Sequence, residues 1–440
     1  MDMYHFIGIK GTGMSSLALV MHSLGYDVQG SDRETHFFTE DALREAGIPI
    51  LPFDEKNIRE DLFIIQGNAF HEDHVEVKRA MELGCKIYHY EEMVGKLTRM
   101  FETITIAGCH GKTTTTSMLA HVLTELAGCN YLIGDGHGYA AKENKYFALE
   151  ACEYQRHFLA YTPTYAVITN IDLDHTDYYK DIDDVRDAYR EYASKAEKMV
   201  IACGDDPYTH SLEVTKPIFF YGLDDDNDIL AKDVVYNESG IHFDVEVEGN
   251  YYGHFDLPFY GKHMLLNSLA VIAICAYERF EAKEVAKALK TFKGAKRRFN
   301  EEVIGDVVLV DDYAHHPTEV RSTIRAARQK YPDKEIVAVL QPHTLARVRD
   351  FGEEFAESLN QADVAYVLPV TLDRGDRYED YPNIDENIIL NKLKNGHLIH
   401  MNEPELLLKH KNAVILFMSP RNIYDLKNAL KELLEQNINK

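Results

Sequence analysis

The chain has 440 residues, and 72 acidic against 47 basic side chains give it a formal net charge of −25. This length predicts two to four domains, and the acidic balance without a lysine-arginine block argues against a nucleic-acid partner. Six cysteines without CxxC spacing are typical of reduced thiols. The start has no basic and apolar leader, and no apolar run reaches membrane-spanning length, so we expect a cytoplasmic protein without membrane insertion.

The first motif is a glycine-rich turn between a strand and a helix. An apolar strand pattern at 4–7 leads into GIKGTGM at 8–14, and helical periodicity follows. Asp32 ends a second strand about 20 positions after the glycines, in the βαβ pattern of a nucleotide-binding unit. Ser16 stands where a dinucleotide fingerprint has its third glycine, which weakens the case for NAD. A tight turn without a ligand is the alternative.

The second motif lies in residues 103–117. A β-branched strand pattern leads into GCHGKT at 108–113, and a helix pattern follows. Glycines let backbone N–H groups approach an anion, and a helix N-terminus adds partial positive charge. We interpret it as a phosphate-binding loop in which Lys112 reaches the phosphates and Thr113 faces Mg²⁺. Ile106 stands where the longer form of this loop has a glycine, so a plain glycine turn is the alternative.

Two later strand patterns end in a carboxylate and an imidazole. Residues 146–149 lead to Glu150, and residues 165–169 lead to a segment that contains His175. Because the carboxyl ends of parallel strands meet at one edge of a sheet, we expect both groups beside the loop. Thr113, Glu150 and His175 would then form a Mg²⁺ site. A solvated loop carboxylate and a capping or core histidine are the structural alternatives.

The remaining pattern completes an α/β protein of three domains. Short alternating strands between 218 and 259, with a hairpin signal at 248–250, predict a small antiparallel sheet beside the central parallel one. The basic cluster 293–299 marks a boundary, either as a phosphate contact or as a solvated linker. We predict a Rossmann-like domain at 1–98, a central P-loop ATPase-type domain at 99–296 and a C-terminal Rossmann-like α/β domain at 297–440.

With these motifs in place, the chain resembles the Mur ligase family over nearly its whole length. The resemblance rests on GIKGTGMS at 8–15, GCHGKTT at 108–114, NIDLDH at 170–175, YGKH at 260–263, KRRF at 296–299, DDYAHHPTE at 311–319 and QPHT at 341–344. The HHPTE and QPHT segments resemble the branch that adds L-alanine to UDP-N-acetylmuramate, of the Gram-positive type. The family's loop is the shorter Gly-x-x-Gly-Lys-Thr form, which accounts for Ile106.

The resemblance implies a ligase of peptidoglycan precursor synthesis that uses ATP and Mg²⁺ and joins L-alanine to UDP-N-acetylmuramate through an acyl phosphate. It implies catalytic roles for Lys112, Glu150, His175, Arg298 and His315, with the metal on Thr113, Glu150 and His175. It places ATP at Gly108, His110, Gly111, Lys112, Thr113, Thr114, Asn267, Arg298 and Asp312. It places the UDP part of the substrate at Gly11, Thr12, Gly13, Met14, Ser31 and Asp32, and alanine at His343 and Arg347. We expect a monomer or weak dimer.

The acceptor side departs from the family's pattern. Ala346 and Val348 stand where the family has hydroxyl residues, and Ser419-Pro420-Arg421 replaces Gly-Ala-Gly, although proline lacks an N–H and arginine adds bulk. These departures leave open a ligase with a peptide or another amino acid as acceptor, and a nucleotide-binding paralogue with weak or no activity. The retained loop argues against the paralogue and against a dehydrogenase. Because Arg190 or Glu191 stands where sister ligases carry a carbamylated lysine, we expect no such modification.

Overall fold

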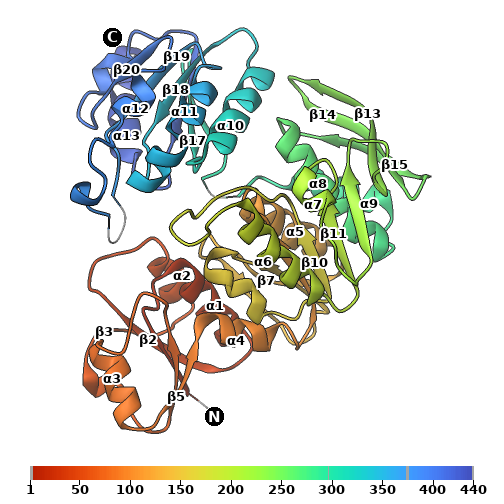
Figure 1. The fold of residues 1–440 in the computed structure, drawn as a ribbon, viewed down its shortest axis with the longest axis vertical. Helices are drawn as coiled ribbons and strands as arrows, with labels where there is room; N and C mark the ends of the chain where they lie inside the picture. The colour runs from red at the N-terminus through yellow and green to blue at the C-terminus, as the bar shows by residue number, and fades with distance from the viewer. Residues whose placement is uncertain (1–2, 296, 373–375, 439–440) are drawn as a thin grey trace. The chain divides into compact units, whose positions relative to one another are not determined.

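The computed structural model describes residues 3–295, 297–372 and 376–438, which fold around three separate β-sheets (Figure 1). The chain divides into two compact units. Residues 1–232, 245–254 and 266–292 form the first unit, and residues 233–244, 255–265 and 293–440 form the second. The expected boundary at 98 lies inside the first unit, although residues 3–97 have a sheet of their own. The expected boundary at 296 lies close to the start of the last segment of the second unit.

The first sheet is parallel and has five strands. Its elements are β1 (Met3–Ile7), α1 (Thr12–Ser23), β2 (Asp27–Asp32), α2 (Glu40–Glu45), β3 (Ile50–Pro52), the 3-10 turn Glu55–Asn57, β4 (Leu62–Gln66), α3 (Val75–Glu82), β5 (Lys86–His89) and α4 (Tyr90–Leu97). The strand order is β3-β2-β1-β4-β5, and β1 pairs in parallel with both β2 and β4. The order reverses at β1, so the turn after β1 lies at the switch point where such sheets bind nucleotides. The predicted Rossmann-like fold is confirmed.

A buried carboxylate ties the helix α3 to this sheet. Glu76 is fully buried and accepts hydrogen bonds from the Ser31 hydroxyl, from Asn57 Nδ2 at 2.8 Å and from the Asp54 N–H at 3.1 Å. His5 Nε2 lies 3.5 Å from the same carboxylate. Burial by itself would raise the pKa of Glu76, but the hydrogen bonds from His5, Ser31 and Asn57 lower it below its ordinary value of 4.5. The carboxylate therefore stabilises the domain in its ionised form.

We expect E76Q to lower the free energy of unfolding at pH 7 by about 1–3 kcal/mol, because an amide leaves buried donors unpaired. The folded-state pKa lies below the unfolded one, so the contribution of Glu76 is complete above about pH 4.5 and is lost as the pH falls through the folded-state pKa. The variant should therefore lose less stability on acidification than the parent. Urea unfolding at several pH values measures both effects, with E82Q, an exposed carboxylate of the same helix, as the control. Equal losses in the two variants would contradict the assignment.

The central sheet has ten strands and is mixed. Its elements are β6 (Glu102–Ala107), α5 (Lys112–Ala127), β7 (Cys129–Leu132), β8 (Gly138–Tyr139), β9 (Tyr146–Glu150), the 3-10 segment Tyr154–Ala160, β10 (Tyr165–Ile168), α6 (Ile182–Ser194), β11 (Met199–Cys203), α7 (Pro207–His210), β12 (Ile218–Gly222), β13 (Ile229–Asn237), β14 (Gly240–Val247), β15 (Asn250–Leu257), α8 (Lys262–Tyr277) and α9 (Ala282–Thr291). The strand order is β15-β14-β13-β12-β11-β10-β6-β9-β7-β8. Two-residue turns join β13 to β14 and β14 to β15, so these neighbours are antiparallel. The strands that we expected as a small antiparallel sheet are thus continuous with the parallel strands.

The position of β6 in this sheet determines where its polar strand ends gather. β6 pairs in parallel with β10 on one side and with β9 on the other. Because parallel strands end at the same edge, the segments that follow them, 108–113, 150–153 and 169–175, share that edge. Residues 103–107 are all buried, so both faces of this strand are covered, and β-branched Thr and Ile residues at 103–106 suit such a strand.

The third sheet has six strands, and an apolar core lies on each of its two faces. Its elements are β16 (Asn300–Ile304), β17 (Val307–Asp312), α10 (Pro317–Lys330), β18 (Glu335–Leu340), α11 (Leu345–Leu359), β19 (Val364–Val367), the 3-10 turn Tyr378–Asp380, α12 (Asn387–Leu390), β20 (Gly396–Leu398), the 3-10 turn Pro404–Leu407, β21 (Ala413–Met418) and α13 (Tyr424–Ile438). The order is β16-β17-β21-β18-β19-β20, and among the described strands of this sheet only β16 pairs antiparallel. Even-numbered residues of β21 pack with α10 and α11, and odd-numbered ones pack with α13. Both faces of β21 are buried, so its sequence is apolar throughout.

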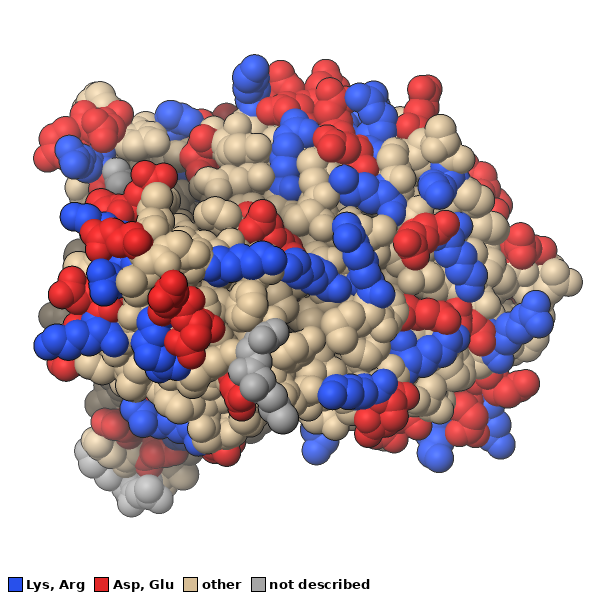
Figure 2. Space-filling view, turned by 90° about the horizontal axis from the view of Figure 1, so that it is seen from below, with Lys and Arg blue, Asp and Glu red and all other residues tan. Residues whose placement is uncertain are grey.

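The surface carries charges of both signs. On the face drawn in Figure 2, lysine and arginine side chains are interspersed with aspartate and glutamate. Among the described residues, no helix is long and apolar enough to cross a membrane.

Candidate functional site

The loop between β6 and α5 needs glycine at two positions. Gly108 has φ +144°, and a side chain there would collide with the Thr169 hydroxyl. Gly111 has φ +82°, and a Cβ on it would lie 2.8 Å from Asn267 Oδ1. Left-handed backbone and close neighbours both require glycine. The same geometry shows that Asn267, predicted at the nucleotide, lies against this loop from α8.

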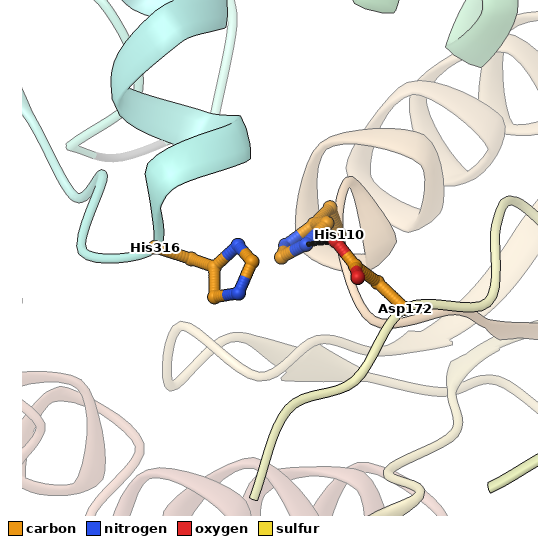
Figure 3. A group of neighbouring side chains, drawn as sticks. All are labelled: His110, Asp172 and His316. Atoms are coloured by element: carbon orange, nitrogen blue, oxygen red, sulfur yellow. Dashed lines mark hydrogen bonds and ion pairs between the residues drawn. The ribbon is translucent and has the colours of Figure 1, made fainter. Parts of the chain in front are cut away.

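Side chains that follow β10 hold the loop in place. The Asn170 side chain accepts from the His110 N–H at 2.9 Å and donates to the His110 carbonyl at 2.8 Å. The Thr169 hydroxyl donates to the same carbonyl at 2.7 Å. Figure 3 shows the His110 imidazole directed at the Asp172 carboxylate, with Nε2 3.1 Å from Oδ2. The loop conformation therefore depends on the neighbouring strand as well as on its own glycines.

Lys112 folds back over the loop and pairs with a carboxylate that the sequence analysis did not select. Its Nζ donates to the Gly108 carbonyl at 2.5 Å, and it lies 3.0 and 2.9 Å from the two oxygens of Glu153. Burial by itself would lower the pKa of Lys112, but the Glu153 carboxylate raises it above its ordinary value. Burial would raise the pKa of Glu153, but the charge of Lys112 and contact with His175 lower it. Both partners are therefore ionised.

The predicted metal ligands form two separate contacts. Thr113 Oγ1 donates to Glu150 Oε1 at 3.0 Å, and the other oxygen of Glu150 accepts from the Gly134 N–H at 2.8 Å. His175 instead lies beside Glu153, with 3.6 Å between its Nε2 and Oε1. The hydroxyl and carboxylate of the first pair are hard oxygen donors of the kind that Mg²⁺ prefers, so these residues fit that ion. Thr114, predicted at the nucleotide, is buried in the first turn of α5.

Glu153 is a candidate site residue that the sequence analysis did not select. It stands three residues after Glu150 in the same segment, where nothing in the pattern separates it from a solvated carboxylate. The structure buries it to 1 % exposure between Lys112 and His175. The only signal in the sequence is its place just beyond a buried strand that neighbours the loop.

The first glycine-rich turn leads into the N-terminus of α1. Gly11 is the residue before this helix, Thr12 is exposed, Gly13 lies against the Tyr90 ring, and Met14 is buried. The orphan N–H groups of a helix N-terminus favour an anion at this position.

The last two residues of β2, Ser31 and Asp32, form hydrogen bonds within the first domain. Both oxygens of Asp32 accept from backbone N–H groups, of Lys10 at 2.7 Å and of Arg33 at 2.8 Å. The Ser31 side chain is fully buried and points at Glu76, so its hydroxyl contacts the interior and not the surface. The hydroxyl of Ser31 is therefore engaged inside the domain, and its predicted place at the substrate stays a prediction.

Two successive residues connect the first turn to the Glu150 site. The Ser16 hydroxyl of α1 donates to the Ile133 carbonyl at 2.9 Å, and the next residue, Gly134, donates its N–H to Glu150. Both motifs belong to the first compact unit. Segment 133–134 therefore fixes the turn that follows β1 relative to the loop that follows β6.

In the second unit, Glu319 organises two predicted catalytic residues. Its Oε2 accepts from the His315 N–H at 3.0 Å and lies 3.1 Å from His315 Nδ1, while its Oε1 lies 3.6 Å from Arg298 Nη1. Burial and the neighbouring Arg298 charge lower the pKa of His263 to about 4, which places the predicted YGKH segment near this arginine. Glu319 is in the first turn of α10, where the helix dipole stabilises a negative charge.

Asp312, predicted at the nucleotide, is buried and accepts hydrogen bonds from the backbone on both sides of it. Its oxygens accept from the N–H groups of Phe299 and Ala314, each at 2.8 Å. Burial raises the pKa of Asp312, and the nearby Arg298 charge opposes this effect. Lys296, part of the predicted basic cluster, lies outside the described residues. His316, also drawn in Figure 3, accepts from the Thr318 N–H at the start of α10.

The predicted acceptor residues follow β18, beside the loop that departs from the family's pattern. His343 is 9 % exposed, and its Nε2 accepts from Arg421 Nε at 3.1 Å. Arg347 is equally buried in the first turn of α11, after Thr344 caps the helix. Because β18 and β21 are parallel neighbours, the segments after them meet at one edge.

The Glu153 contact makes a prediction about His175. Burial by itself would lower the pKa of His175, but the hydrogen bond to Glu153 and the nearby acidic charges raise it above 6.5. We therefore expect E153Q to lower this pKa, because it removes the largest favourable contact of the imidazolium. NMR titration of the His175 ring protons measures the midpoint, and E125Q on the exposed side of α5 is the control. An unchanged midpoint in E153Q would show that the contact does not form in solution.

Sequence models of one protein family match three consecutive parts of the chain. "Mur ligase family, catalytic domain" matches residues 3–102, "Mur ligase middle domain" matches 106–275, and "Mur ligase, glutamate ligase domain" matches 297–420. Together these matches span most of the sequence.

Solved structures are similar over the whole chain. The UDP-N-acetylmuramate-alanine ligase of Thermotoga maritima is 27 % identical, with 99 % of this chain and 100 % of that one covered and a TM-score of 0.81. A murein peptide ligase of Psychrobacter arcticus is 22 % identical over 99 % of both chains, with a TM-score of 0.71. The MurF ligase of Thermotoga maritima, solved in complex with ADP, is 19 % identical over 87 % of this chain and 97 % of that one, with a TM-score of 0.65. The last two show a shared fold.

Proposed function

We propose that this chain, which belongs to the Mur ligase family, is an ATP-dependent ligase that joins L-alanine to UDP-N-acetylmuramate and releases ADP and phosphate. The observation that carries the chemistry is the loop at 108–113, with Lys112 held by Glu153 on one side and Thr113 bonded to Glu150 on the other. The similarity to an alanine ligase over 99 % of the chain supports the choice of substrates.

The proposed reaction has two steps. A carboxylate oxygen of the muramate attacks the γ-phosphorus of ATP, and the bond from this phosphorus to the bridging oxygen breaks. The muramate carboxylate becomes an acyl phosphate, and ADP is the leaving group. The alanine amine then attacks the acyl carbon, the carbon–oxygen bond to phosphate breaks, and the amine loses a proton. The first step brings two anions together, so Lys112 and Arg298 would lower the barrier by offsetting their charge.

Thr113 and Glu150 would hold Mg²⁺, because they offer two hard oxygen atoms that already lie 3.0 Å apart. The ion would supply positive charge at the phosphate oxygens. Lys112 lies at the start of α5, where loop N–H groups and the helix dipole favour phosphate, and its contact with Glu153 keeps the ammonium beside the loop. ATP would also be bound by the other predicted residues that lie in or against this loop, which are Gly108, His110, Gly111 and Asn267.

His315 is suited to accept the proton that the amine loses. Its Nδ1 faces two acceptors, the Tyr313 carbonyl at 2.9 Å and Glu319 Oε2 at 3.1 Å, so Nδ1 carries the ring proton. The lone pair is then on Nε2, which gives the imidazole a basic atom on its other side. Glu319 would stabilise the imidazolium that forms.

A ligase with a peptide acceptor is the second candidate. Ser419-Pro420-Arg421 changes the loop beside His343, and the chain shares its fold over 99 % of its length with a murein peptide ligase. The two candidates use the same phosphate chemistry and differ only in the amine that attacks.

Phosphate release tests both candidates. With ATP and Mg²⁺ present, release should require UDP-N-acetylmuramate and L-alanine together, because the acyl phosphate forms on one and is consumed by the other. Omitting either should reduce release to background in a coupled phosphate assay. Release with a muramyl peptide acceptor and none with alanine would overturn the first candidate, and release with no acceptor of either class would overturn both.

K112A should lower kcat by about 10²–10³-fold, because it removes a cation that faces the developing charge. The same substitution leaves Glu153 buried without its charged partner, so thermal stability should also fall. K142A, which changes an exposed lysine of the same unit, should leave both quantities unchanged. Steady-state kinetics with all substrates measure the effect, and a kcat within threefold of the parent would exclude Lys112 from the reaction.

A further inference from the structure

The loop after β21 follows the carboxyl end of a strand that lies in the middle of the third sheet. β21 pairs with β17 on one side and β18 on the other, so residues 419–421 lie between the segments that follow these two strands. The segment after β17 carries His315, and the segment after β18 carries His343. A side chain from this loop therefore projects at the edge to which the proposed acceptor residues belong.

Arg297 holds the backbone of this loop by its carbonyl groups. Its guanidinium donates to the carbonyls of Ser419 at 2.8 Å, Pro420 at 3.2 Å and Arg421 at 3.0 Å. The same guanidinium lies 5.1 Å from the ring centroid of Tyr313, which adds a cation–π contact. Three successive carbonyls are thus fixed on one side of the loop.

In residues 419–421, no backbone N–H group is left to bind a ligand. The Ser419 N–H donates to the Asp312 carbonyl at 3.1 Å, and the Arg421 N–H donates to the Ser419 hydroxyl at 3.0 Å. Pro420 has no N–H. A glycine-rich loop would present N–H groups to an anion at such a strand end, whereas here the donors that the loop directs toward His343 come from the Arg421 side chain.

His343 and Ser419 fix the direction of this guanidinium. The Ser419 hydroxyl donates to Gln341 Oε1 at 3.1 Å while it accepts from Arg421, so the base of the side chain is held from the β18 side. Arg421 Nε then donates to His343 Nε2, which requires an unprotonated Nε2 and therefore a neutral imidazole with its proton on Nδ1. The residue itself is exposed, unlike Arg347. A ligand at the edge of the sheet can reach Arg421.

We propose that Arg421 is a specificity-determining residue that binds the carboxylate of the acceptor amino acid. The proposal rests on the proposed ligase function, in which the acceptor carries an amine and a carboxylate. A planar guanidinium matches a carboxylate in two parallel hydrogen bonds and gives orientation as well as affinity. Holding the carboxylate leaves the amine as the group that attacks the acyl phosphate. The enzyme therefore discriminates against acceptors whose carboxylate is blocked.

Kinetics with L-alanine and L-alaninamide test this role. In R421A the KM for L-alanine should rise about 10- to 100-fold, the loss expected for a hydrogen bond to a charged group, with kcat changed less than about threefold. R421K should be intermediate, because it keeps the charge and loses the fork. Added guanidinium ion should lower the KM of R421A, which a merely structural role would not do. R328A, which removes an exposed arginine paired with Asp363 in the same unit, is the control.

The outcomes separate this proposal from the proposed function. An unchanged KM for L-alanine in R421A, or a parent enzyme that uses L-alaninamide as well as L-alanine, would overturn the role of Arg421 and leave the ligase function standing. A parent enzyme without activity toward L-alanine would overturn the alanine assignment. The Arg421 test then proceeds with the acceptor that supports phosphate release and with its amide, and the same KM change supports or overturns the proposal.

Discussion

The buried ion pair of Lys112 and Glu153 fixes the lysine of the predicted phosphate-binding loop. Burying one charge without the other would be strongly unfavourable, so each residue holds the other in its ionised form. The ammonium also bonds to the Gly108 carbonyl, and this contact keeps it close to the loop that a phosphate would occupy. Glu153 further contacts His175, so the pair also links the segments that follow β9 and β10.

Buried and partly buried carboxylates hold neighbouring segments together in this acidic chain. Glu76 holds α3 against the first sheet, Glu150 connects the loop to segment 133–134, and Glu319 positions His315 and Arg298. Each of these carboxylates is satisfied by N–H, hydroxyl or cationic partners, as burial of a charge requires. The few cations near the loop and around Glu319 are therefore held in defined directions, and a net charge of −25 remains compatible with binding anionic substrates.

The departure at Ser419-Pro420-Arg421 has a structural explanation that is independent of any family. Proline is tolerated because the loop needs no N–H at that position, since Arg297 binds its carbonyl instead. Arginine is tolerated because its side chain extends toward His343 at the open edge of the sheet. The loop thus presents a side-chain donor, Arg421, in place of backbone N–H groups, and Arg297 holds its backbone.

The sequence by itself determined the elements and most of the loop chemistry. Helix and strand periodicity, the glycines at 108 and 111 and the apolar run of β21 are local features, because backbone conformation and burial of both strand faces restrict which residues can stand there. Glu150 and Thr113 were predicted together because parallel strand ends meet at one edge, and the structure does bring them into contact.

Only the tertiary structure decided which polar residues are buried and form contacts inside the protein. Burial separates Glu153 and Ser31 from residues of the same type at the surface, and burial depends on packing against segments that are distant in sequence. The contacts of Glu153 with Lys112, of Arg297 with residues 419–421, and of Arg421 with His343 join positions that no local period relates. The antiparallel strands likewise proved continuous with the central sheet, because strand pairing is a long-range choice that hairpin signals do not specify.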